Sequence, residues 1–140
     1  MVVMSAAAHT IRAQFQPEVD EFIDDLTMFA SGSYLSEEDK ELWDEPFDPS
    51  VLPELRKMLE QYLDEVDALG SQPEDQQLVG LVGPFYERLE AFNVRHADAV
   101  LEPEEKADIE TLVIRVCTAA GATDEALEAL PEFELSLIHI

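Results

Sequence analysis

Basic side chains are scarce in this 140-residue sequence, which has 8 lysines and arginines against 32 aspartates and glutamates. The formal net charge of −24 lies far outside the magnitude of about 2–8 that is common for small domains. Nucleic acids and anionic membranes are bound by Lys and Arg side chains that neutralise phosphates, so this composition excludes both as direct partners. A basic protein surface is the partner that such a charge attracts.

Cysteine and long apolar runs are scarce as well. The single cysteine, Cys117, excludes an internal disulfide framework and gives no sign of an oxidising compartment. No apolar run in the sequence approaches the ~20 residues that cross a bilayer, and residues 1–8 lack the basic start and long apolar stretch of a signal peptide. These absences predict a cytoplasmic protein.

Signatures of catalysis and of metal binding are missing from the sequence. It has no Glu-x-x-His pair of the kind that a di-iron bundle uses and no aspartate-rich loop around a glycine, as in an EF-hand. It also lacks a Cys-x-x-Cys pair, a phosphate-binding glycine loop and a serine nucleophile elbow. We therefore predict a protein that is not an enzyme and uses no cofactor and no dedicated metal site. His96, near a predicted helix end, is interpreted as a partner of the helix dipole, and Cys117 as a buried, inert thiol.

Apolar residues recur at the 3.6-residue spacing of helices through most of the chain, and at 46% they suffice for a core. In the first predicted helix Pro17 is expected in the first turn, where its missing N–H costs nothing. An additional turn around Ile11 and Phe15 is left open. The face expected to point inward holds Val19, Phe22, Ile23, Leu26 and Phe29. On the other side, Glu18, Glu21 and Asp25 form an acidic row.

Caps, prolines and glycines divide the rest of the chain. They predict a short helix at residues 36–46 and further helices at residues 48–70, 73–92, 103–121 and 123–130. Gly83 and Pro84 lie inside one of these patterns, which predicts a kink or a division into two shorter helices. No stretch alternates as a strand does. The sequence therefore predicts an all-α, single-domain bundle of about four to six helices, one of them kinked near Gly83 and Pro84.

The acidity belongs to the whole predicted domain and not to one tail. Residues 1–70 carry 17 acids and 4 bases, and residues 71–140 carry 15 acids and 4 bases. The last six residues, LSLIHI, differ from everything before them and look like translated sequencing-adapter read-through. We therefore expect an acidic helical domain at residues 1–134 and a non-native or disordered tail at residues 135–140, with the native C-terminus absent.

Residues 34–49 are the most distinctive segment, because acids there alternate with aromatic and aliphatic side chains. Such a mixture suits a basic partner whose groove accepts the rings. In the alternative interpretation, Leu42, Trp43 and Phe47 anchor the connection to the bundle and the acids are solvated. The contacts predicted for a partner are Glu37, Glu41, Trp43, Asp44 and Glu45.

Residues 78–130 resemble a group of short, uncharacterised bacterial helical proteins. The shared layout is a helix that ends in an asparagine-containing turn at residues 89–93, an acidic connection, and a helix that starts at residues 102–106 and ends at residues 120–121. These proteins have no agreed activity, so the resemblance implies a helical fold.

The predicted function is that of a protein-interaction module which binds a basic protein surface, as an inhibitor, antitoxin, immunity protein or mimic of nucleic-acid charge. One alternative is an enzyme whose pocket gathers carboxylates from distant parts of the sequence and raises their pKa values. Another is a salt-adapted structural protein without a specific partner, whose stability rises with salt. The oligomeric state is left open.

Overall fold

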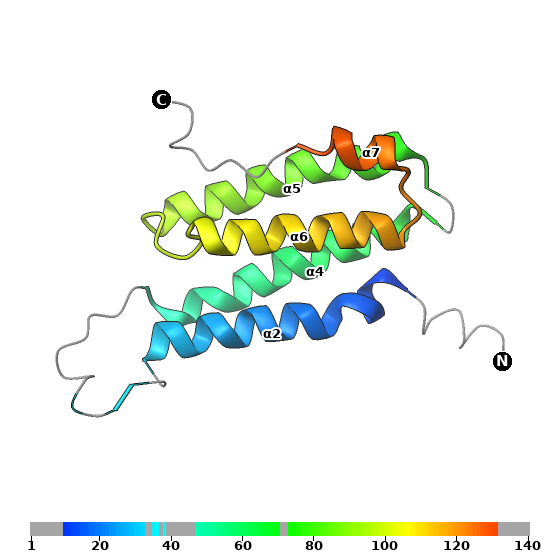
Figure 1. Ribbon diagram of the computed structural model, residues 1–140. Helices are drawn as coiled ribbons and strands as arrows, with labels where there is room; N and C mark the ends of the chain where they lie inside the picture. The colour runs from blue at the N-terminus through cyan, green and yellow to red at the C-terminus, as the bar shows by residue number, and fades with distance from the viewer. Residues whose placement is uncertain (1–9, 33–34, 37, 39–46, 71–72, 132–140) are drawn as a thin grey trace, which may run out of the picture.

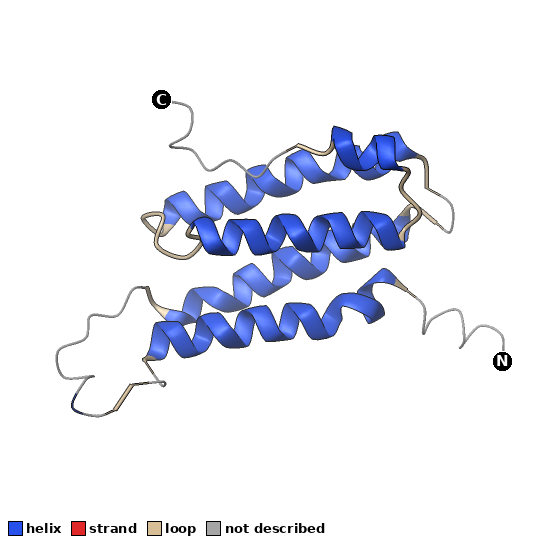
Figure 2. Ribbon diagram, viewed as in Figure 1, coloured by secondary structure: helices blue, strands red, loops and turns tan. Residues whose placement is uncertain are grey.

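The computed structural model describes residues 10–32, 35–36, 38, 47–70 and 73–131, and within these residues the secondary structure is helical, with no strand (Figure 2). The predicted all-α bundle is therefore confirmed. Most of the short helix predicted at residues 36–46 and the whole tail at 135–140 lie outside the described residues. The elements, in chain order, are α2 (Ile11–Ser31), the 3₁₀ turn η1 (Pro49–Val51), α4 (Leu52–Ala68), α5 (Asp75–Arg95), α6 (Pro103–Ala119) and α7 (Asp124–Ala129).

The four long helices run in alternating directions (Figure 1), with α2 packed on α4 and α6, and α4 packed on α5. The short helix α7 packs against α5 and α6. Each long helix turns one apolar stripe to the centre, where Tyr62 of α4 stacks on Phe85 of α5 with 4.4 Å between ring centroids. Each fully buried side chain of this size stabilises the fold by about 1.5–3 kcal/mol.

Helix α2 begins earlier than Pro17 predicts. Thr10 caps it by accepting a hydrogen bond from the Ala13 N–H at 3.0 Å. The Asp67 carboxylate of α4 accepts bonds from the Ile11 and Arg12 N–H groups at 2.8 and 3.0 Å. The expectation that Pro17 lies in the first turn was therefore wrong, because two extra turns are secured by a cap from a neighbouring helix.

Helix α5 runs without interruption through Pro84, so the alternative of two shorter helices was wrong. The bend expected there stays a prediction. Buried Val82, Phe85 and Leu89 lie on both sides of the proline, and their burial outweighs the roughly 3 kcal/mol that an interior proline costs. The helix begins at Asp75, two residues after Pro73.

The helix predicted to end at residue 92 continues to Arg95, whereas the predicted boundaries at Asp48, Gly70, Gly121 and Thr123 are confirmed. Asp48 caps η1 by accepting a bond from the Ser50 N–H at 2.9 Å. Gly70 and Gly121 follow α4 and α6 with φ of 97° and 100°, the left-handed conformation that favours glycine. Thr123 caps α7 by accepting a bond from the Ala126 N–H at 3.2 Å.

The turn between α5 and α6 is organised around Asn93, whose side chain is buried (1% exposed). Its Oδ1 accepts bonds from the Val100 and Leu101 N–H groups at 3.2 and 2.8 Å, and its Nδ2 donates to the Leu101 carbonyl at 2.9 Å. Ala97 and Asp98 lie in the same turn with φ of 61° and 58°. The asparagine thus holds a connection that contains two strained residues.

Candidate functional site

The contacts predicted from the sequence, Glu37, Glu41, Trp43, Asp44 and Glu45, lie outside the described residues. The segment that contains them leads to Phe47, which is buried (8% exposed). The Phe47 ring lies 6.4 Å, centroid to centroid, from the ring of Phe29 on α2. For Phe47, the alternative prediction of an anchor on the bundle is therefore confirmed.

The two other residues singled out in the sequence, Cys117 and His96, each contact an aromatic side chain of the bundle. Cys117 is fully buried, its Sγ lies 3.7 Å from the Tyr62 hydroxyl oxygen, and burial raises the pKa of the thiol. A buried, protonated thiol is a poor nucleophile. His96 forms the C-cap of α5, as predicted, and its ring meets Phe92 edge-on with 4.7 Å between centroids.

The few basic side chains form ion pairs between helices of the same chain. All five arginines and Lys106 form ion pairs with acids on a neighbouring helix. The pairs are Arg12 with Glu60 and Asp64, Arg56 with Asp20, Arg88 with Glu65, Arg95 with Glu54, Lys106 with Glu90, and Arg115 with Glu18. Surface pairs contribute only about 0–1 kcal/mol each. Their consequence here is that the charge left for a partner is almost entirely negative.

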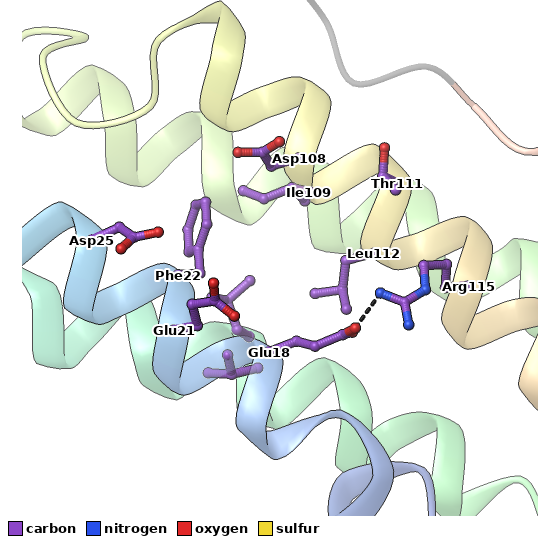
Figure 3. A pocket seen from close by; sticks show the side chains of 11 residues that line it. Glu18, Glu21, Phe22, Asp25, Asp108, Ile109, Thr111, Leu112 and Arg115 are labelled. Carbon is purple, nitrogen blue, oxygen red and sulfur yellow. Dashed lines mark hydrogen bonds and ion pairs between the residues drawn. The ribbon is translucent and has the colours of Figure 1, made fainter.

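A hollow of about 290 Å³ lies between α2 and α6 (Figure 3). The buried side chains of Val19, Leu59 and Ile109 line its apolar floor. Phe22 and Leu112 project into it from the two helices (Figure 3). A second hollow of about 380 Å³ continues along the same two helices to Leu26 and Phe29. The two hollows share Phe22, Asp25 and Asp108 in their linings, so they adjoin, and we name them together the α2–α6 groove.

Both walls of the α2–α6 groove are acidic. Seven carboxylates line it, and they are Glu18, Glu21 and Asp25 on α2 with Glu102, Glu104, Glu105 and Asp108 on or beside α6. Arg115 lies at one end and pairs with Glu18 across the groove (Figure 3). Partial burial raises the pKa of Glu105, and the charges of Glu102 and Glu104 raise it further, while the hydrogen bond from the Glu102 N–H at 3.0 Å opposes them.

The groove was missed in the sequence because two of its rings were assigned to the core. Phe22 is only half-buried and Phe29 is 39% exposed, whereas Val19, Ile23 and Leu26 are buried as predicted. The prediction that all five face inward was therefore wrong for Phe29, and Phe22 packs against the edge of the core while it lines the hollow toward α6. The acidic row beside Phe22 was the available signal.

Within the part of the chain that the structure describes, no group of three or more His, Cys, Asp or Glu side chains is placed to hold a metal ion. None of the described helices is long and apolar enough to span a membrane. Comparison with protein-family models, curated proteins and solved structures gave no match. The groove and the charge are therefore the features from which a function can be inferred.

Proposed function

We propose that this protein is a non-catalytic interaction module of the cytoplasm that binds a basic protein surface through the α2–α6 groove. The observation that carries the proposal is the combination of an open apolar floor with carboxylates on both walls. Apolar contacts provide affinity, and opposite charges provide fast and selective association. Inhibitor, antitoxin, immunity and charge-mimic roles all use a surface of this chemistry.

The segment predicted to bind a partner is followed in the chain by a residue that packs beside the groove. Phe47, which follows Glu45 by two residues, packs on Phe29, and Phe29 lines the groove. The acids predicted as contacts therefore connect to one end of the groove in the chain. We propose that Glu37, Glu41, Trp43, Asp44 and Glu45 contact the same basic partner.

The proposal is tested with two charge-matched triple variants. One reverses three groove acids, as Glu21→Lys, Asp25→Lys and Asp108→Lys. The control reverses three exposed acids that do not line the groove, as Glu87→Lys, Glu125→Lys and Glu128→Lys. Both variants change the net charge equally, so a difference between them reports position and not total charge.

Binding of a fluorescein-labelled oligolysine peptide is measured by fluorescence anisotropy at moderate salt. We expect the groove variant to lose roughly tenfold or more in affinity while the control stays close to the unchanged protein. Equal losses in the two variants would contradict a groove site. Absence of binding together with stability that rises steadily with salt would favour the salt-adapted structural alternative.

A further inference from the structure

We infer that the occupant of the α2–α6 groove is a single amphipathic, cationic α-helix of about three turns, an inference that rests on the proposed function. The length follows from the row Glu18, Phe22, Asp25 and Phe29 along α2. Eleven residue steps at a rise of 1.5 Å make this row about 17 Å long, which is three helical turns. A helix with apolar residues at positions i, i+4, i+7 and i+11 presents anchors over the same length.

The groove favours a helix over an extended peptide because its walls are themselves helices. Their backbone N–H and C=O groups are already bonded within α2 and α6, so the groove offers no strand edge with which an extended chain could pair. An extended peptide would place unpaired backbone groups over Phe22 and Leu112. A helix satisfies its own backbone bonds and turns only side chains to the floor.

The charge on the walls determines which residues flank the apolar face of the bound helix. Carboxylates line both α2 and α6, so an inserted helix meets negative charge on each side of its apolar face. Lysine or arginine on both flanks satisfies this arrangement, with the apolar stripe between them. Arg115 at one end makes that end the less negative part of the groove.

A second copy of the chain does not have this chemistry. Each copy carries a net charge of −24, and its five arginines and Lys106 are already paired within the chain. Two acidic grooves therefore repel at moderate salt. The occupant is a different, basic protein.

Two labelled peptides of identical composition test the inference with the full chain. In the first, leucines stand at the i, i+4, i+7 and i+11 positions and lysines flank them; in the second the same residues are rearranged so that no apolar face forms. We expect the patterned peptide to bind at least about tenfold more tightly and to gain helical circular dichroism on binding. Phe29→Ala should weaken the patterned peptide by roughly tenfold, and Val94→Ala, which removes an exposed side chain (61%) away from the groove, should not.

The outcomes separate the two proposals. If both peptides bind equally and the groove charge reversal abolishes both, the helical occupant is overturned while the proposed function survives. If neither peptide binds, both proposals fail. Self-association in sedimentation that Phe29→Ala removes would overturn the inference in favour of a second copy. Phe22→Ala is a further test of the same peptide binding. If circular dichroism shows that Phe22→Ala does not fold, the result for Phe29→Ala decides whether the helical occupant holds, because Phe29 is partly exposed and its replacement disturbs the core less.

Discussion

Replacing Asn93 by alanine should destabilise the protein more than any surface change. The substitution removes three hydrogen bonds and leaves two N–H groups and one carbonyl of Val100 and Leu101 without their partner. Both residues are 1% exposed, so water cannot replace the amide without local opening. At about 1–3 kcal/mol for each of the three unsatisfied groups, and with about 0.5 kcal/mol returned by the better helix propensity of alanine, the loss is about 2.5–8.5 kcal/mol. That is a large part of a typical stability of about 5–15 kcal/mol.

Urea unfolding followed by far-UV circular dichroism measures this loss, and thermal unfolding should show a midpoint lower by about 8–30 °C. Gln76→Ala is the matched control, because it removes an exposed amide from the same helix and should cost under about 0.5 kcal/mol. Asn93→Asp keeps the acceptor for the two N–H groups, so its loss of stability should lie between those of Asn93→Ala and Gln76→Ala. A loss below about 1 kcal/mol for Asn93→Ala would refute the view that this side chain holds the turn.

Three further predictions concern single groups. Ala97→Gly should stabilise the protein by about 0.5 kcal/mol in urea unfolding, because glycine adopts a φ of 61° without strain; destabilisation would contradict this. Glu105→Gln keeps an acceptor for the Glu102 N–H and removes a partly buried charge, so it should raise stability at neutral pH. Because the folded-state pKa of Glu105 is raised, that gain should disappear as the pH falls below the ordinary value of 4.5, and a gain that persists there would exclude this cause. Cys117 should react with a thiol reagent only on unfolding, and equal rates for native and urea-unfolded protein would contradict its burial beside Tyr62.

Features with a local cause could be predicted from the sequence. The boundaries at Asp48, Gly70 and Thr123 follow from capping chemistry within a few residues, and the structure confirms all three. The start of α2 could not be predicted in this way. Its first N–H groups are bonded by Asp67, which is 56 residues away from Ile11 in the chain. A cap from another helix leaves no periodic or local signal.

The candidate site was less predictable than the fold. The spacing of Phe22 and Phe29 indicates that they share a side of α2 with the core residues, but it does not indicate how closely a neighbouring helix approaches that side. Only the arrangement of α6 determines that these rings line a groove. The pairing of Arg115 with Glu18, 97 residues apart, is likewise a tertiary property.

The ion pairs of α4 bear on the handedness of the bundle. Arg56, Glu60 and Asp64, four residues apart, follow one flank of its buried stripe and meet α2, while Glu54 and Glu65, three turns apart, follow the opposite flank and meet α5. Four helices that run alternately up and down can follow one another around the centre in a left-handed or a right-handed order. Apolar stripes fit both arrangements, because they face the same centre in each.

The two arrangements differ in which flank of α4 meets α2. In the mirror arrangement, Arg12 would lose Glu60 and Asp64, Arg56 would lose Asp20, and Arg88 and Arg95 would lose Glu65 and Glu54. The interhelical ion pairs of the scarce arginines thus fit only one of the two arrangements that the apolar stripes allow.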